Sequence, residues 1–367
     1  MDYTQKLNYH YRPKKGWIND PNGLVYFRGY YHVFYQHAPD FEKPWKQPMH
    51  WGHARTKDFI NWEELPVALY PNTEYDEGGC WSGTAIVKDD CLYLFYSSIN
   101  VPSAERKYAQ SVSVAYSKDG INFQKYDKNP VIKRYPVNGG PDFRDPAVRC
   151  IGGKYYCVMA TGNKEDKAAR LLLYKSDDLF NWEYASVMSE WSDCKYAECP
   201  SFMSADDRYL LTASVCPLDS GHYFSVMFGS FENDKFKIEY TSEVDKGPDQ
   251  YAGQAFQDHL GRNIIISWIP GWEYSGYAPY DIGCMSVPRE IKLTDGKITL
   301  YPIDELQYLL TDEDPSVKVT ESGFIIEREG REPVVYNGKV RDLKILRDGY
   351  IVEVFVNGGE EVYSALL

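Results

Sequence analysis

The heptapeptide TKDFINW, residues 56–62, recurs along this chain with the same pattern of a hydroxyl, an Asp, an Asn and an aromatic residue. Its copies are SKDGINF at 117–123 and SDDLFNW at 176–182, and SFENDKF at 230–236 is a degenerate fourth. Asp and Asn in such a stretch bind neighbouring backbone groups, which is typical of a tight turn between two strands. A period of about 60 residues with about four strands per repeat is typical of a β-propeller. We therefore predict a five-bladed β-propeller that ends at about residue 305.

Short apolar and aromatic runs fill the intervals between these turns. Examples are Tyr31–Gln36, Leu92–Tyr96, Tyr155–Ala160 and Ile264–Trp268, and Gly, Asn, Asp and Pro separate such runs. Aromatic residues make up 16% of the chain, with 32 tyrosines, and they suit the pleated surface of a sheet. Because helical periodicity is scarce and short strands follow at steady spacing, we predict an all-β fold.

The length of 367 residues allows two domains. A polar segment without strand character, DEDPSVKVTES at 312–322, marks the boundary between them. We expect a five-bladed β-propeller domain at 1–311 and a small C-terminal antiparallel β-sheet module at 312–367. The Asn-Gly pairs at 337–338 and 357–358 are typical of hairpin turns, and we expect them to connect strands of that sheet.

Composition and missing motifs exclude several classes of function. The net charge of −13 repels nucleic-acid phosphates, and no apolar stretch approaches the roughly 18 residues of a membrane helix, so we expect neither nucleic acid nor membrane as a partner. Because no P-loop, GxGxxG, HExxH or GxSxG motif occurs, we expect no cofactor and no metal. His50 and His53 form a close pair, but a structural role is favoured because no third ligand stands nearby.

The cysteines and the N-terminus bear on location. The eight cysteines form no CxxC pair, and a chain of this length does not need disulfide bonds, so we interpret them as reduced thiols. The N-terminal stretch MDYTQKLNYHYRPKKGW contains no apolar core of a signal peptide. We therefore expect a cytoplasmic protein.

Three acidic residues stand in local sequences that point to chemistry. Asp20 lies in WINDPNG, Asp145 in DFRDP and Glu198 in YAECPSF, each near the start of a predicted blade. The innermost strands of a propeller line its central funnel, so these side chains are expected to converge there. Because Glu198 has only uncharged neighbours in the sequence, we expect a desolvated acid that holds a proton near neutral pH, as a general acid does. Such an acid together with further carboxylates is typical of glycosidases.

At these residues the chain closely resembles the fructosidases of glycoside hydrolase family 32, which include invertases, sucrose-6-phosphate hydrolases, inulinases and levanases. The resemblance runs from about Tyr9 to Leu306. The motifs that carry it are WINDPNG (17–23), FYQ (34–36), HWGHA (50–54), WSGTA (81–85), FRDP (143–146), AECP (197–200), DQYAGQAF (249–256) and SVPRE (286–290). The family's fold is a five-bladed propeller followed by a β-sandwich, which agrees with the repeat.

The resemblance implies a role for each matched residue. Asp20 would be the nucleophile, Glu198 the acid/base and Asp145 the carboxylate that binds fructosyl hydroxyls and stabilises the transition state. Arg144, next to Asp145, would keep that acid ionised. Two tryptophans are assigned by spacing alone, Trp45 and Trp268. The sugar pocket would be lined by Asn19, Gln36, Trp45, Trp81, Ser82, Arg144, Asp249 and Trp268.

The resemblance also implies the reaction. It indicates a retaining β-D-fructofuranosidase that hydrolyses the terminal non-reducing β-fructoside of sucrose or short fructo-oligosaccharides through a covalent fructosyl-enzyme. Fructan exo-hydrolase, sucrose-6-phosphate hydrolase and fructosyltransferase stay as alternatives, because no phosphate-binding motif is visible and hydrolysis differs from transfer only in the acceptor. A sugar-binding propeller without activity would have lost at least one of the three acids, and all three are present.

The C-terminal segment departs from the family, whose members carry a full β-sandwich. About 55 residues follow the boundary, and DGYIVEVFVNGGEEVYS at 348–364 resembles the closing strands of that sandwich. We therefore expect a truncated sandwich of one sheet. Because one small sheet cannot bury both of its faces, we expect a homodimer in which two such sheets meet, with packing of the sheet on its own propeller as the alternative.

Overall fold

The computed structural model describes residues 6–40, 47–100, 110–163, 165–219, 221–243, 245–270 and 283–367. Antiparallel strands dominate this part of the chain, and a short 3-10 helix, η2 (Asp304–Leu309), follows the last strand of the ring. The prediction of an all-β fold is confirmed. In the same residues, no helix has the length and apolar character needed to span a membrane.

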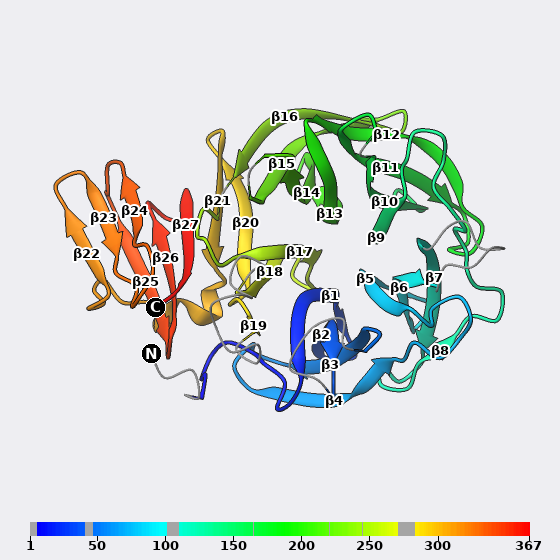
Figure 1. The fold of residues 1–367 in the computed structure, drawn as a ribbon, viewed down its shortest axis with the longest axis horizontal. Helices are drawn as coiled ribbons and strands as arrows, with labels where there is room; N and C mark the ends of the chain where they lie inside the picture. Colours follow the sequence, from blue (N-terminus) through cyan, green and yellow to red (C-terminus); the bar gives the residue numbers. More distant parts are fainter. Residues whose placement is uncertain are drawn as a thin grey trace.

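Sheets of four paired strands follow one another around a central axis, and Figure 1 shows them as a ring with β1, β5, β9, β13 and β17 innermost. Strands adjacent in sequence pair with each other in the first four sheets. These sheets contain β1 (Trp17–Phe27), β2 (Tyr30–Ala38), β3 (His50–Thr56) and β4 (Trp62–Leu69); β5 (Gly79–Lys88), β6 (Cys91–Ile99), β7 (Gln110–Ser117) and β8 (Gln124–Lys125); β9 (Asp142–Ile151), β10 (Lys154–Asn163), β11 (Ala168–Ser176) and β12 (Glu183–Ser192); β13 (Cys194–Ala205), β14 (Arg208–Pro217), β15 (Tyr223–Glu232) and β16 (Lys235–Glu243). The next sheet contains β17 (Tyr251–Gln257), β18 (Asn263–Ile269), β20 (Arg289–Thr294) and β21 (Lys297–Pro302), with the short β19 (Cys284–Met285) paired to β18.

The repeated heptapeptide forms the turn between the third and fourth strands of the first three sheets. In the first copy, the Asp58 carboxylate accepts hydrogen bonds from two backbone N–H groups, at 2.9 and 2.8 Å, and from the side chain of Asn61 at 2.8 Å. Asp119 and Asp178 accept the equivalent bonds in the other copies. The degenerate copy connects β15 to β16 through Asn233-Asp234, whose φ angles of 51° and 60° make the turn without a side-chain acceptor. The prediction that these stretches are turns is therefore confirmed.

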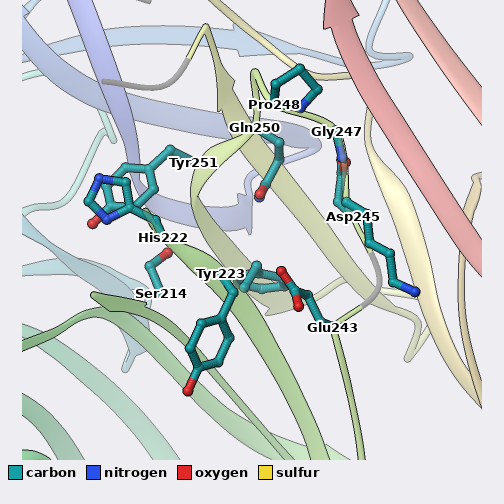
Figure 2. Close-up of a pocket in the computed structure, with 11 residues that line it drawn as sticks. Ser214, His222, Tyr223, Glu243, Asp245, Gly247, Pro248, Gln250 and Tyr251 are labelled. Atoms are coloured by element: carbon teal, nitrogen blue, oxygen red, sulfur yellow. The ribbon is translucent and has the colours of Figure 1, made fainter. Parts of the chain in front are cut away.

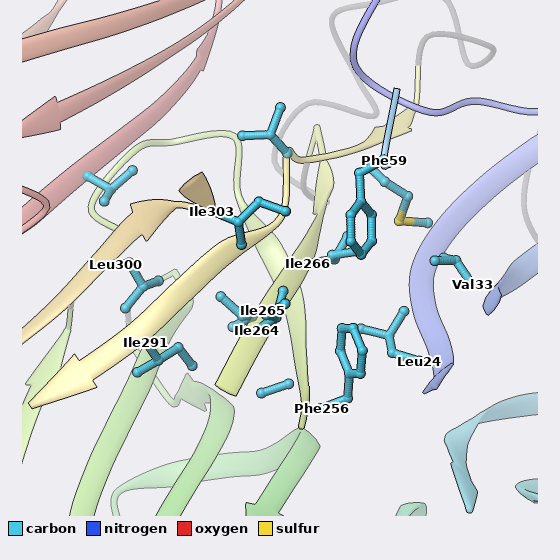
Figure 3. Close-up of a cluster of buried hydrophobic side chains, with 14 of the residues drawn as sticks. Leu24, Val33, Phe59, Phe256, Ile264, Ile265, Ile266, Ile291, Leu300 and Ile303 are labelled. Atoms are coloured by element: carbon cyan, nitrogen blue, oxygen red, sulfur yellow. The ribbon is translucent and has the colours of Figure 1, made fainter. Parts of the chain in front are cut away.

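A cluster of buried apolar side chains closes the ring between the first and last sheets. Leu24 and Val33 come from β1 and β2, and Phe256, Ile264 and Ile266 come from β17 and β18 (Figure 3). Each of these five side chains is at most 3% exposed. Because apolar burial contributes about 25 cal/mol per Å², this contact holds the N-terminal strand against the last blade and fixes both beside the central axis.

Two three-stranded sheets, rather than one, follow the ring. They contain β22 (Val317–Thr320), β23 (Gly323–Ile326) and β24 (Val334–Asn337), and β25 (Leu343–Asp348), β26 (Ile351–Val356) and β27 (Glu361–Leu366). The prediction of a single sheet is therefore wrong. The Asn-Gly pair at 357–358 forms the β26–β27 hairpin as expected, whereas the pair at 337–338 lies between the two sheets.

Both faces of the second sheet are covered within this chain. On one face, Val354 packs with Phe324 and Tyr336 of the first sheet. On the other face, Phe355 and Val362 join the core of the ring. Every side chain of β26 is buried as a result, which explains why all of them except Glu353 are apolar. The alternative, packing on its own propeller, therefore holds for this sheet. A homodimer through the C-terminal module stays a prediction.

Candidate functional site

Each innermost strand contains an extra residue at the same level of the ring, and β1 and β13 contain a second irregularity elsewhere. In β5, Trp81 and Gly83 face the consecutive residues Ser97 and Tyr96, so Ser82 is additional. The same irregularity lies between residues 18 and 21 of β1, 144 and 147 of β9, 198 and 201 of β13, and 251 and 254 of β17. A bulge bends its strand and re-aims a side chain, so five strands direct residues toward one region.

The sequence at these bulges explains why the strands bend there. The pairs 20–21, 145–146 and 199–200 each end in proline, which cannot donate a ladder hydrogen bond and is therefore tolerated at a bulge. Asp145 and Cys199 adopt φ angles of 61° and 49°, in the left-handed region that is costly for residues other than glycine. Such backbone strain concentrates at functional sites.

A cavity of about 380 Å³ lies where the bulges meet, and the three acids predicted to be catalytic all line it. They come from three different sheets, which the sequence could only suggest. Every lining residue in the described part of the chain is polar or aromatic. These residues are Asn19, Asp20, Gln36, Trp81, Ser82, Gln110, Asp142, Arg144, Asp145, Tyr196, Glu198 and His222.

Asp20 is held by donors on both carboxylate oxygens. Asn19 donates to Oδ1 at 3.0 Å, and Ser82 donates to Oδ2 at 2.8 Å. The thiol of Cys199 lies 3.5 Å from Oδ2. Burial raises the pKa of Asp20, the negative charge of Glu198 raises it further, and these donors oppose the shift. The donors leave the carboxylate one fixed orientation toward the cavity.

Asp145 is buried and does not receive the guanidinium that we expected. Its Oδ2 accepts a hydrogen bond from the backbone N–H of Cys199 at 2.8 Å, and its own N–H donates to Ser97 at 2.7 Å. Burial raises the pKa of Asp145 to about 7, against the opposing charge of Arg144. The expectation that Arg144 holds Asp145 ionised is therefore corrected, because desolvation outweighs that charge.

Glu198 receives the guanidinium instead. Nε and Nη2 of Arg144 donate to its Oε1, at 3.1 and 2.9 Å, while Nη1 binds Asp142 at 3.1 Å. The Tyr251 hydroxyl is in hydrogen-bond contact with Oε2. Uncharged surroundings were expected for Glu198, and this is wrong, because Arg144 reaches it from the neighbouring sheet. Both carboxylate oxygens are thus held from opposite sides.

Tyr251 is a site residue that the sequence analysis did not select, although it lies in the quoted motif DQYAGQAF. It is 4% exposed, and burial raises the pKa of its hydroxyl well above the ordinary value, so the phenol keeps its proton. The ring of His222 lies 4.6 Å from its ring. Figure 2 shows the two rings side by side at a second pocket, of about 170 Å³, which adjoins the first. The signal in the sequence that could have identified Tyr251 was its place within this motif, at the start of a strand.

Four residues that line the cavity were also missed: Gln110, Asp142, Tyr196 and His222. Tyr196 lies under the Arg144 guanidinium, whose carbon is 5.0 Å from the ring centroid. The Gln110 side chain accepts the N–H of Phe143 at 2.8 Å, and Asp142 binds Arg144. Asp142 lies two residues before Arg144, and Tyr196 lies two residues before Glu198. Because side chains two residues apart in a strand point to the same side, this spacing was a usable signal.

Two predicted pocket residues, Trp268 and Asp249, do not line the cavity. Trp45 lies outside the described residues. Trp268 is 1% exposed and packs edge-on against Trp17, with ring centroids 5.7 Å apart, in a cluster that also contains Tyr251. Asp249 is fully buried against the C-terminal strands, where it binds Arg328 at 3.0 Å. Both placements differ from the expectation, because Trp268 packs among Trp17 and Tyr251 and Asp249, which precedes β17, pairs with Arg328.

The histidines suspected as a close pair belong to different environments. His53 Nε2 lies 2.9 Å from His32 Nδ1, and its ring stacks on Phe34 at 4.0 Å. Burial lowers the pKa of both His53 and His32, so the rings pack as neutral groups. His50 contacts Tyr70 edge-on instead. Among the residues with described positions, no cluster of His, Cys, Asp and Glu could hold a metal ion.

The geometry suits substitution at a carbon between two carboxylates. Asp20 presents a carboxylate whose orientation is fixed by Asn19 and Ser82, and Glu198 faces the same cavity with both oxygens bound. One carboxylate that attacks and one that transfers a proton are the requirements for glycoside cleavage.

Comparisons with known proteins also indicate glycoside cleavage. The sequence model described as "Glycosyl hydrolases family 32 N-terminal domain" matches residues 10–302. The chain is 33% identical to a sucrose-6-phosphate hydrolase of Zymomonas mobilis, with 93% of this chain and 69% of that protein covered. It is 34% identical to a levanase of Bacillus subtilis, with 83% and 48% covered. A solved family 32 β-fructofuranosidase of Bombyx mori is 29% identical, with a TM-score of 0.85 and 100% and 90% of the chains covered. A mutant of that protein was solved in complex with sucrose.

Proposed function

Because the chain belongs to glycoside hydrolase family 32, we propose that it is a retaining β-D-fructofuranosidase. It is a glycoside hydrolase that acts on fructosides, as its relatives support. Its substrate is the terminal non-reducing β-fructoside of sucrose or a short fructo-oligosaccharide. The observation that carries the proposal is the convergence of Asp20, Asp145 and Glu198 from three sheets on one cavity.

The first half of the reaction forms a covalent intermediate. Asp20 attacks the anomeric carbon C2 of the fructosyl unit, and the bond from C2 to the leaving oxygen breaks. Glu198 donates its proton to that oxygen, so the leaving sugar departs as an alcohol. The transition state carries positive charge, which the carboxylate of Asp20 and the ionised form of Asp145 stabilise. While Glu198 holds the proton that it donates, its charge no longer raises the pKa of Asp20, which favours an ionised nucleophile.

The second half of the reaction releases fructose. Glu198, now a carboxylate, removes a proton from water, and the water oxygen attacks C2 of the fructosyl-enzyme. The ester bond to Asp20 breaks, and the nucleophile is regenerated. Arg144 and Tyr251 bind Glu198 in both of its roles and so keep one carboxyl position for proton donation and removal.

The cavity favours an uncharged substrate over a phosphorylated one. Among its described lining residues, Arg144 is the only Arg or Lys, and it is already bound to Glu198 and Asp142. A sugar phosphate prefers unengaged Arg or Lys donors. Sucrose-6-phosphate hydrolysis is kept as a second candidate because the relative from Zymomonas mobilis carries that name. Hydrolysis rates with sucrose, sucrose-6-phosphate, 1-kestose, inulin and levan, measured side by side, decide between them.

Methanolysis tests the retaining mechanism. In water with added methanol, a fructosyl-enzyme attacked from its open face gives methyl β-D-fructofuranoside, and NMR identifies the anomer. We expect the β product, and the α product would contradict retention. Release of fructose from none of the five sugars would contradict the proposed function itself.

We also propose that the protein works in a reducing compartment, the cytoplasm. All eight cysteines are free in the structure, and seven of them are buried. Free thiols are usual where glutathione and thioredoxin keep cysteines reduced. The protein is isolated and denatured in the presence of an alkylating reagent, without prior reduction. We expect all eight cysteines to be alkylated.

A further inference from the structure

The segment from Asp245 to Tyr251 runs beside the C-terminal strand β27 before it reaches Glu198. Asp245 pairs with Val362 in a parallel bridge, the N–H of Lys246 donates to the Val362 carbonyl at 2.8 Å, and the N–H of Asp249 donates to the Ser364 carbonyl at 3.3 Å. A Cβ at Gly247 would lie 2.2 Å from the Ser364 backbone nitrogen, so only glycine fits this close approach. The segment is thus attached to β27 like an added strand.

A buried ion pair anchors the end of this segment. Oδ2 of Asp249 accepts hydrogen bonds from Arg328 Nη2 at 3.0 Å and from the N–H of Leu366 at 2.8 Å. Arg328 also donates from Nε to the Leu366 carbonyl at 2.8 Å. The two side chains are 7% and 0% exposed, so water does not screen the pair. Arg328 therefore joins Asp249 and β27 in one fixed arrangement.

Tyr251 follows Asp249 by two residues and contacts Glu198, the proposed acid/base. Its hydroxyl binds Oε2 of Glu198, while Arg144 binds Oε1. Figure 2 shows Asp245, Gly247 and Gln250 along this segment, with Tyr251 beyond them beside His222. Because Tyr251 has one rigid ring, a shift of the backbone at 249–250 moves the hydroxyl and with it the carboxyl that it holds.

We propose that Arg328 is a positioning residue for the acid/base Glu198. Arg328 acts through Asp249 and Tyr251, so the C-terminal module contributes to proton transfer as well as to stability. This inference rests on the proposed function of Glu198 as proton donor. A buried charge pair whose partner is lost leaves an uncompensated charge, and the segment then relaxes.

Two substrates with different leaving groups separate positioning from stability. Sucrose has a poor leaving group and needs the proton of Glu198, whereas p-nitrophenyl β-D-fructofuranoside has a leaving group that departs without it. The measured quantity is kcat/KM, which reports formation of the fructosyl-enzyme. The variants are Arg328→Ala and Arg328→Lys, with Arg341→Ala as the matched control, because Arg341 forms an exposed ion pair with Glu360 in the same module.

We expect Arg328→Ala to lower kcat/KM for sucrose at least about 10-fold, as a part of the 10²–10⁴-fold that general acid catalysis supplies, and to lower it less than about 2-fold for the aryl fructoside. Arg328→Lys should recover part of the loss, and Arg341→Ala should change neither value. Equal losses with both substrates, or no loss with either, would overturn the proposal. If Glu198→Gln also lost activity equally with both substrates, the proposed role of Glu198, and not only that of Arg328, would be wrong.

Discussion

His10 should make the stability of this protein depend on pH between neutral and alkaline conditions. Its ring lies between two carboxylates, with Nδ1 2.9 Å from Asp348 and Nε2 3.1 Å from Glu353, and all three side chains are buried. Burial alone would lower its pKa, but the hydrogen bonds and charges of the two acids outweigh burial and raise the pKa of His10 from 6.5 to about 9. The folded protein therefore keeps a proton on His10 that the unfolded chain releases.

The sign and size follow from this difference. A raised pKa stabilises the folded state fully below pH 6.5, and the contribution is lost as pH rises through about 9. At about 1.4 kcal/mol for each pKa unit, the difference corresponds to about 3 kcal/mol of unfolding free energy. His10→Gln removes the cation and leaves Asp348 and Glu353 without it. We expect the variant to be less stable than the wild type by about 3 kcal/mol at pH 6, and this gap to close toward pH 10.

Urea unfolding, followed by the fluorescence of the nine tryptophans at pH 6, 8 and 10, measures the gap. His259→Gln is the control, because His259 is exposed and lies against Tyr26 on the surface. It should leave the pH dependence unchanged. A gap between wild type and His10→Gln that stays constant from pH 6 to pH 10 would refute the assignment of a buried cationic His10.

Two predictions concern the acids. Asp20→Asn and Glu198→Gln should each lower sucrose turnover by at least about 10²-fold, because each removes one carboxylate role, while circular dichroism and the melting temperature stay near wild type; turnover within a few-fold of wild type in either variant would contradict the assignment. Because Asp20 must be ionised and its pKa is raised above 3.8, kcat/KM should fall on the acid side at a pH above 3.8; a pH profile that stays flat down to pH 4 would contradict it.

The local turn chemistry was predictable because it depends on neighbours in sequence. Asp58 binds backbone groups two and three residues ahead, so the pattern of Asp and Asn is enough to specify the turn. The same holds for the Asn-Gly turn at 357–358, whose φ angles of 55° and 73° suit those two residues. The pair at 337–338 has the same composition but lies between sheets, because the surrounding strands, and not the pair, determine what it connects.

The site was predictable as a set of residues and not as a set of contacts. The motifs placed Asp20, Asp145 and Glu198 near strand starts, and the bulges bring them to one cavity. The hydrogen-bond partner of Arg144 could not be read from its adjacency to Asp145. Both residues line the cavity at the bulge of β9, where the alternation of a regular strand is interrupted, and Arg144 reaches a carboxylate of the next sheet.

In the C-terminal module, too, the sequence determined some features and the tertiary structure decided others. Its apolar alternation determined that strands would form there and that they needed a cover. The cover itself, a second sheet on one side and the ring on the other, depends on which surfaces meet in three dimensions. Local hydrogen bonding and side-chain periodicity depend on residues that are close in the sequence, and they can therefore be predicted from it. Contacts such as Asp249 with Arg328, 79 residues apart, arise only when the folded chain brings distant segments together and removes water from their charges.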